Sequence, residues 1–457
     1  MGEGVKDWAA GHSMGQNPRE AADSEWQHQE REPAAVNARA REHEPEIREW
    51  PILGSTASYG LVGEIARCAT ATSEADPVAV MMTAHAWAAA AFGRSRFYRV
   101  GDTLHHARFA AVLVGASSRA RKGTSFAPVQ RVFRAAEAIL RAKSELPFPS
   151  GLPLSVVEGL STGEGLIAEI RDARNDEDKG AVTDKRLLVV EGEFGKVLHQ
   201  FQRPGNTLSA VMRLSWDGSD LGVLTKTSRE RATAPHICIV GHITRHELNA
   251  LFSANDVFNG VANRLLWAAV RRSQLVPFAK PMSDTDVAKI ASELARVIEH
   301  AHRHNGPAGE LVMSNSAADF WVQIYAELTQ DHPGVLGAVT SRAEAQTIRL
   351  AMNYALLDGA DLIELKHLEA ALCCWRYCFD SAAFIFNGAE IDPVAHRIVE
   401  ALREGPKSQS DIHAIFARNV PKSRIDPVLV ELQERGRIRM TSEKTRGAPR
   451  RVWSLIQ

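Results

Sequence analysis

The most constraining feature of this sequence is an apolar run that ends in a loop of small and basic residues. Residues 109–114 read FAAVLV, residues 115–125 read GASSRARKGTS, and a helical pattern over 126–143 follows. The order strand, small-residue loop, helix predicts a cradle for a phosphate group. Loop N–H groups and the positive end of a helix converge on one point in such an arrangement.

The loop differs from the usual phosphate-binding loop, which reads G-x-x-x-x-G-K-[ST]. Lys122 precedes Gly123 instead of following a glycine, and it lies seven residues after Gly115. Lys122 still supplies a positive charge, and the hydroxyls of Thr124 and Ser125 suit Mg²⁺. We therefore predict that these five residues bind a nucleotide, with ATP and Mg²⁺ as cofactors. The alternative is an exposed turn of an α/β domain that binds nothing.

Composition excludes several classes of protein. With 457 residues the chain has room for about two to four domains. Its 45% hydrophobic and 24% charged residues are typical of a soluble globular protein. It has no run of about 18 apolar residues and no apolar segment that reads as a secretory signal, so we expect no membrane partner. Five cysteines without a C-x-x-C pair fit a reduced, cytoplasmic protein.

Two carboxylates stand at the end of the next buried strand. Residues 186–191 read RLLVVE, and Gly192 and Glu193 follow. Open α/β sheets bind ligands at the carboxyl ends of their strands. We expect one of Glu191 and Glu193 to hold Mg²⁺, and another carboxylate to orient the attacking water. The residues do not decide which carboxylate has which role; we predict Glu191, Thr124 and Ser125 as the Mg²⁺ ligands. A strand that simply runs into an acidic turn is the alternative.

Two further strands carry polar groups at their ends. Residues 235–244 read PHICIVGHIT, and we predict that His242 or Thr244 lies near the γ-phosphate. Arg264 comes just before the apolar residues 265–270. It is either a surface charge or, in an oligomeric NTPase, a group that reaches the nucleotide of a neighbouring subunit.

The remaining patterns are helical. The pattern over residues 59–92 predicts two helices, with a break between them near Asp76 and Pro77. Residues 284–387 read as almost wholly helical. Arg342 and Arg349 are seven apart and therefore share one helix face. We predict that both face the nucleotide across a cleft; the alternative is that both are solvated.

The C-terminal module predicts a winged helix, because three short helices precede a basic hairpin. From residue 418 to 457 there are ten Lys or Arg and four Asp or Glu. This local excess indicates DNA, although a winged helix can also dock protein. The predicted DNA contacts lie near the start of the third helix and in the hairpin: Lys422, Arg424, Arg446, Arg450 and Arg451.

Seven ordered segments together resemble the mobile-element P-loop ATPase family, formerly a domain of unknown function, which is associated with primase-polymerases in plasmid and phage replication. These segments are 114–125, 159–172, 186–198, 205–218, 236–248, 259–273 and 341–359. The resemblance implies a RecA/AAA-like P-loop NTPase core, a helical lid and a ring-shaped homo-oligomer. In this likeness Arg264 is similar to the trans-acting arginine of replicative ring helicases. Because only about 100 residues precede the loop, any primase-polymerase would be a separate protein.

The sequence thus predicts an α/β fold in five parts. They are a disordered tail (1–48), a helical N-terminal segment (49–100), a P-loop NTPase core (101–282), a helical lid (283–390) and a winged-helix domain (391–457). The predicted function is a DNA-dependent ATPase of a plasmid or phage replication system, similar to a helicase or a helicase loader. Two alternatives stay open: a winged-helix initiator or regulator that uses its NTPase fold as a nucleotide switch, and a mobile-element defence ATPase.

Overall fold

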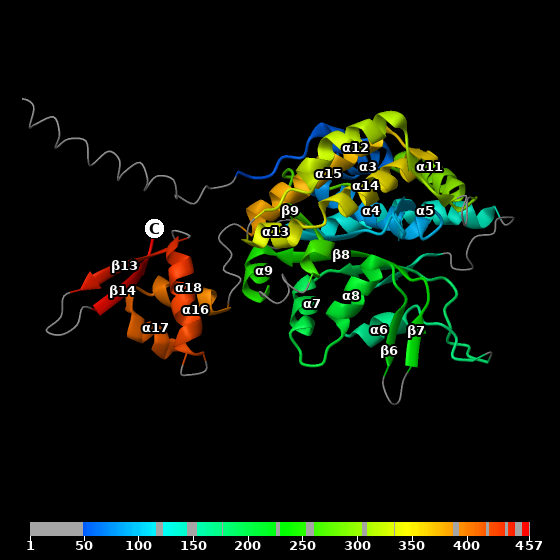
Figure 1. The fold of residues 1–457 in the computed structure, drawn as a ribbon. Helices are drawn as coiled ribbons and strands as arrows, with labels where there is room; N and C mark the ends of the chain where they lie inside the picture. The colour runs from blue at the N-terminus through cyan, green and yellow to red at the C-terminus, as the bar shows by residue number, and fades with distance from the viewer. Residues whose placement is uncertain are drawn as a thin grey trace, which may run out of the picture. The chain divides into compact units, whose positions relative to one another are not determined.

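The computed structural model describes residues 49–115, 122–143, 153–175, 177–224, 229–252, 260–303, 309–332, 334–386, 393–416, 420–434, 437–443 and 450–456. The predicted disordered tail lies outside these residues. The chain divides into two compact units, a larger one within Arg48–Pro393 and a smaller one within Val394–Gln457 (Figure 1). In the described part of the chain, no helix combines the length and the apolar character that crossing a bilayer requires.

A five-stranded parallel sheet forms the centre of the larger unit. Its strands lie in the order β4-β5-β8-β3-β9. Their bounds are Ala110–Gly115 for β3, Ser155–Val157 for β4, Arg186–Glu191 for β5, His236–Thr244 for β8 and Leu266–Val270 for β9. The strands are almost continuously apolar because helices cover both faces of the sheet. The predicted α/β architecture is confirmed at this level.

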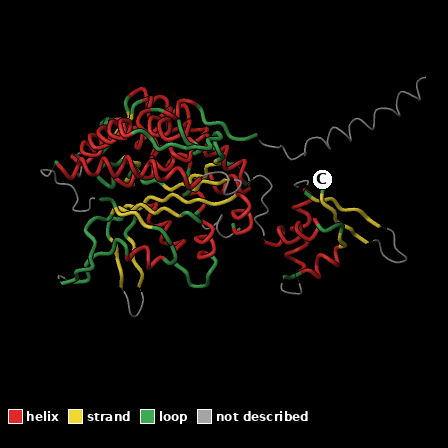
Figure 2. Tube along the Cα trace, turned by 180° about the vertical axis from the view of Figure 1, so that it is seen from behind, coloured by secondary structure: helices red, strands yellow, loops and turns green. Residues whose placement is uncertain are grey.

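Helices form a layer on each face of the sheet, as Figures 1 and 2 show. Ala111 and Leu113 of β3 face one layer, whereas Val112 and Val114 face the other. The first layer contains α3 (Gly60–Thr70), α4 (Pro77–Phe92), α5 (Phe126–Ala142), α11 (Asp284–Arg303), α14 (Ala343–Asp358) and α15 (Leu365–Ile385). The second contains α6 (Gly163–Ala168), α7 (Phe194–Phe201), α8 (Leu208–Asp217) and α9 (Arg245–Leu251).

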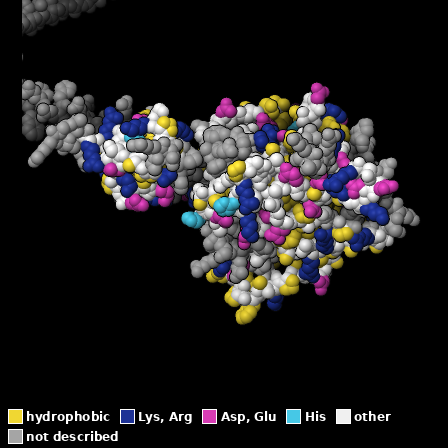
Figure 3. All heavy atoms as spheres, turned by 90° about the horizontal axis from the view of Figure 1, so that it is seen from below, with side chains coloured by type: hydrophobic (Ala, Val, Ile, Leu, Met, Phe, Trp, Pro, Cys, Tyr) yellow, Lys and Arg dark blue, Asp and Glu magenta, His cyan; other side chains and the backbone are white. Residues whose placement is uncertain are grey.

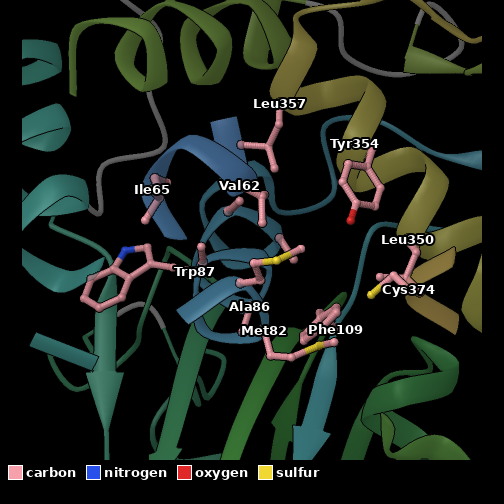
Figure 4. Packing of buried hydrophobic residues seen from close by; sticks show 14 of the residues in the cluster. Val62, Ile65, Met82, Ala86, Trp87, Phe109, Leu350, Tyr354, Leu357 and Cys374 are labelled. Atoms are coloured by element: carbon pink, nitrogen blue, oxygen red, sulfur yellow. The ribbon is translucent and has the colours of Figure 1, made fainter. Parts of the chain in front are cut away.

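Helix α4 is buried on every side. The Asp76 carboxylate caps it by accepting a hydrogen bond of 2.8 Å from the N–H of Val78, and Pro77 occupies its first turn. The pair Asp76-Pro77 therefore separates α3 from α4, as the sequence predicted. All residues from 78 to 92 are buried, which is expected of a helix that is apolar all round. Figure 4 shows buried side chains of α3, α4, α14 and α15 packed in one hydrophobic cluster.

Smaller elements complete the larger unit. The segment 284–387, predicted to be almost wholly helical, also contains a short strand pair, β10 with β11. These elements are η2 (Ser55–Ser58), β1 (Tyr98–Val100), β2 (Thr103–His105), η4 (Lys122–Ser125), β6 (Leu221–Leu224), β7 (Arg229–Ala232), η5 (Ala262–Arg264), β10 (Val312–Met313), α12 (Asn315–Leu328), α13 (Gly334–Thr340) and β11 (Leu362–Ile363).

The smaller unit packs three helices against a three-stranded antiparallel sheet of order β12-β14-β13. Its elements are α16 (Pro393–Arg403), β12 (Lys407–Ser408), α17 (Gln409–Ile415), α18 (Lys422–Glu434), β13 (Ile438–Glu443) and β14 (Arg450–Leu455). Ile398, Ile412 and Trp453 belong to its buried core. The three helices and the hairpin match the sequence prediction, whereas strand β12 was not predicted.

We expect Ala86→Leu to lower the free energy of unfolding by about 1–3 kcal/mol, because the added atoms have no space around α4. The matched control is Ala326→Leu on α12, where the alanine is exposed. This control should change the stability by less than about 0.5 kcal/mol. Urea denaturation of both variants measures the difference, and equal effects would contradict the burial of α4.

Candidate functional site

The carboxyl edge of the sheet contains a topological switch point, where the connections that leave two neighbouring strands pass to opposite faces of the sheet. From β3 the chain crosses through α5 on one face of the sheet, whereas from the neighbouring β8 it leaves through α9 on the other face. Gly115 at the end of β3 pairs with Thr244 at the end of β8. Open α/β sheets bind ligands in the crevice at such a switch point.

The predicted phosphate loop follows Gly115 directly. Residues 116–121 and the side chain of Lys122 lie outside the described residues, so their predicted roles stay predictions. The backbone of η4 continues into α5, and it includes Gly123.

The two predicted hydroxyl ligands of Mg²⁺ differ in exposure. Ser125 is completely buried, and its Oγ lies 3.5 Å from the Oγ1 of Thr83 on α4. Thr124 is exposed. Of the two hydroxyls, Thr124 is therefore the one that a ligand can reach.

The two carboxylates at the end of β5 lie in opposite environments. Glu191 is 3% exposed, and its Oε1 accepts hydrogen bonds from the N–H groups of Gly159 (2.7 Å) and Leu160 (2.5 Å). Burial raises the pKa of Glu191, although these two hydrogen bonds oppose the shift. Glu193 is exposed and forms an ion pair of 2.7 Å with Lys196, which lowers the pKa of Glu193.

A third carboxylate, Glu158, was missed in the sequence. It follows β4 directly, its Oε1 lies 3.4 Å from the N–H of Gly192, and its charge contributes to the raised pKa of Glu191. A repeated signal marks it, because V-V-E-G occurs at 156–159 and again at 189–192. The structure pairs the two copies, since β4 and β5 are neighbours. Two acidic groups therefore adjoin at this edge.

His242 and Thr244 lie near the carboxyl end of β8. His242 is buried and pairs with Leu113 of β3. The Thr244 hydroxyl caps α9 by accepting a hydrogen bond of 3.1 Å from the N–H of Glu247. No group of three His, Cys, Asp or Glu side chains within the described ranges has a metal-binding arrangement. The Mg²⁺ site formed by Thr124, Ser125 and Glu191 stays a prediction.

The three predicted arginines gather at the amino edge of the sheet, around the ring of Trp216. The guanidinium carbons of Arg349, Arg342 and Arg264 lie 3.6, 5.0 and 5.5 Å from its centroid. Arg264 precedes β9, and Gly115 lies at the opposite end of β3, about 17 Å away by strand length. This position does not support contact between Arg342 or Arg349 and a nucleotide that the loop of the same chain holds.

The arginines around Trp216 differ in their exposure to solvent and in their hydrogen-bond partners. Arg349 is only 2% exposed, so the interpretation that Arg342 and Arg349 are both solvated is wrong for Arg349. Arg264 forms a two-contact ion pair with Asp217, at 2.8 and 3.1 Å, and donates to the carbonyl oxygen of Gly260 at 2.7 Å. A role for Arg264 toward a neighbouring subunit stays a prediction.

The basic residues of the smaller unit lie on its surface. Lys422 and Arg424 occupy the exposed first turn of α18, and Arg451 is exposed on β14. Arg450 is also exposed and forms an ion pair of 3.1 Å with Asp411. Figure 3 shows Lys and Arg side chains on the face of this unit in view. The predicted contact Arg446 lies outside the described residues.

Comparison with known proteins adds no family to these observations: neither the protein-family models nor the curated proteins contain a match to this chain.

We expect Glu191→Ala to lower the free energy of unfolding by about 1–3 kcal/mol, because two backbone N–H groups lose their acceptor. Glu191→Gln keeps an oxygen in the same place and is the control, with a smaller loss. Guanidinium denaturation at pH 7 measures both. If the two variants were equally stable, Glu191 would not hold the loop after β4.

Proposed function

We propose that this chain is an ATP hydrolase with a P-loop NTPase core that acts on DNA, in the manner of a replicative helicase or a helicase loader. The observation that carries the proposal is the sheet. The small-residue loop follows β3 at the switch point beside β8. Strands β5 and β4, which carry carboxylates at their carboxyl ends, lie on the other side of β8. An anion cradle and carboxylates then share one edge, as phosphoryl transfer requires.

The residues at this edge suit ATP and Mg²⁺. Loop N–H groups and Lys122 hold the β- and γ-phosphates. The exposed Thr124 hydroxyl and the Glu191 carboxylate are oxygen ligands of the kind that Mg²⁺ prefers. When bound, the metal ion neutralises the charge that develops on the transferred phosphoryl group.

We assign the water-orienting role to Glu158 in preference to Glu193. Glu193 is exposed and held by Lys196, which lowers its pKa and weakens it as a base. Glu158 adjoins Glu191 at the ends of neighbouring strands. A carboxylate beside the metal ligand is in the place from which a water molecule is oriented toward phosphorus.

The smaller unit supports the DNA part of the proposal. We interpret it as a winged helix in which α18 is the recognition helix and β13 with β14 is the wing. The exposed cations at the start of α18 and on β14 suit contacts with DNA phosphates. In a ring of subunits, Arg264 would complete the site of a neighbour, with ATP releasing it from Asp217.

A nucleotide switch without turnover is the second candidate. One observation favours it: Glu191, Glu193 and Arg264, the three predicted catalytic side chains, each have partners inside the chain. A switch needs binding energy for the nucleotide but no free catalytic carboxylate.

Hydrolysis assays separate these functions. We expect DNA-stimulated phosphate release from ATP. In Lys122→Ala the rate should fall about 10²- to 10³-fold, because the variant lacks the positive charge that stabilises the transferred phosphoryl group. Glu158→Gln should lower the rate by about 10²-fold or more while nucleotide binding persists. Glu193→Gln is the matched control and should retain most of the activity. Nucleotide binding without phosphate release in the unmodified protein would favour the switch.

DNA binding has its own test. Neutralising Arg424 and Arg451 together should flatten the slope of log affinity against log salt by about 2, since each phosphate contact contributes about 0.9. The control is the pair Arg67→Gln and Arg296→Gln, two exposed arginines of the larger unit. Fluorescence anisotropy with labelled duplex DNA at several salt concentrations measures the slopes. Equal slopes in both double variants would contradict the assignment of the DNA-binding face.

A further inference from the structure

The amino edge of the sheet holds more positive charge than its contacts neutralise. Four guanidiniums meet there, those of Arg108, Arg264, Arg342 and Arg349, which we call the arginine cluster. Among the described residues, Asp217 is the one carboxylate at ion-pair distance from any of them. Burying like charges together is costly unless an anion compensates them.

Arg349 is the least satisfied member of the arginine cluster. Its side chain is 2% exposed and stacks on Trp216, and its Nε and Nη1 have no hydrogen-bond partner in the described structure. Burial and the charges of Arg108 and Arg342 lower the pKa of Arg349. Arg108 is 1% exposed, and its Nη1 also has no partner there. A buried donor without a partner requires an explanation, and a polar or anionic group that binds there is one.

A cavity of about 460 Å³ adjoins the arginine cluster. Arg342 belongs to both, and His105 and Asn263 also line the cavity. The Nδ1 of His105 is buried without a partner among the described residues. Burial, together with the charges of Arg349, Arg108 and Arg342, lowers the pKa of His105 to about 4, so its ring is neutral at pH 7. The cavity is within the size range of small-molecule sites.

One part of the cavity lining, which we call the aromatic wall, consists of ring side chains. Tyr98, Trp321 and Tyr325 form it, and the rings of Trp321 and Tyr325 lie 5.8 Å apart. Aromatic faces beside arginines suit a ligand that carries both a flat ring and phosphate groups.

We propose that the arginine cluster and this cavity form a second nucleotide site, separate from the hydrolytic site proposed above. Arg342, which lines the cavity, holds the phosphates of a nucleoside diphosphate, the buried Arg349 adds positive charge next to it, and the aromatic wall holds the ring of the ligand. Entry of the phosphates replaces the contact of 3.3 Å that Arg342 now makes with the Oδ1 of Asn263. The site lies at the amino edge of the sheet, so it does not depend on the loop after Gly115.

Counting bound ADP tests the proposal. We expect calorimetry of the full-length protein to give two ADP per chain for the unmodified protein, one for Lys122→Ala and one for Arg342→Gln. The double variant should bind none. In Lys122→Ala a neighbouring subunit has no nucleotide on its loop to offer, so the remaining ADP must occupy the second site. Arg67→Gln, an exposed arginine elsewhere on the unit, should bind as the unmodified protein does.

The outcomes distinguish the two proposals. One ADP in the unmodified protein and none in Lys122→Ala would overturn the second site and leave the hydrolytic site standing. One ADP in both, lost in Arg342→Gln, would support the second site and remove the hydrolytic one. If adding Arg342→Gln to Lys122→Ala weakened the binding of the one ADP that Lys122→Ala retains by less than about tenfold, the phosphate role of the arginine cluster would be wrong.

Two further measurements examine the chemistry. Inorganic pyrophosphate should displace ADP from Lys122→Ala. Displacement by adenosine but not by pyrophosphate would contradict the role of the arginines. Arg349→Met keeps the contact with Trp216 but removes the buried charge, so we expect the ligand-free Tm to rise. A lower Tm would show that existing contacts already satisfy Arg349, and would count against the site.

Discussion

The complete burial of α4 is the constraint on which the larger unit depends. This Ala-rich helix lies directly on the sheet, and α3, α5, α11 and α14 pack around it. Its last carbonyl groups lie inside the protein, where an unpaired acceptor is costly. Three neighbours provide donors: Arg186 to Ala91 at 2.7 Å, His236 to Ala89 at 2.9 Å and His302 to Ala91 at 2.9 Å. Because these donors come from β5, β8 and α11, one helix end ties the sheet to the outer layer.

The sheet separates two kinds of charge. Glu158 and Glu191 adjoin the ends of β4 and β5 at its carboxyl edge, whereas Arg108 and Arg264 precede β3 and β9 at its amino edge. In a parallel sheet all strands run in the same direction, so residues before and after the strands are kept apart by the strand length. The proposed hydrolytic site and the proposed second nucleotide site follow from this separation.

Much of the fold was predictable from the sequence, because it depends on local patterns. Apolar runs predicted four of the five central strands, β3, β5, β8 and β9, but not β4. Asp76-Pro77 predicted the break between two helices, and the C-terminal spacing predicted three helices and a hairpin. Strand β12 was missed, since two residues carry too little periodicity to detect. The candidate site was predicted less well. The sequence did not indicate Glu158, because β4 is too short to give a clear strand pattern. Only the pairing of β4 with β5 brings the Glu158 carboxylate close to that of Glu191.

The chemical groups can be read from the residue order alone: a loop of small residues with a lysine, carboxylates after buried strands, paired arginines and a basic C-terminal module. Which of these groups are buried, and which of them meet, depends on the folded arrangement. Glu191 and Glu193 are two residues apart, yet one is enclosed by the loop after β4 and the other faces solvent. Arg342 and Arg349 contact Trp216 from α8, far away in the sequence. Burial and charge compensation depend on segments that only folding brings together, and no local pattern contains that information.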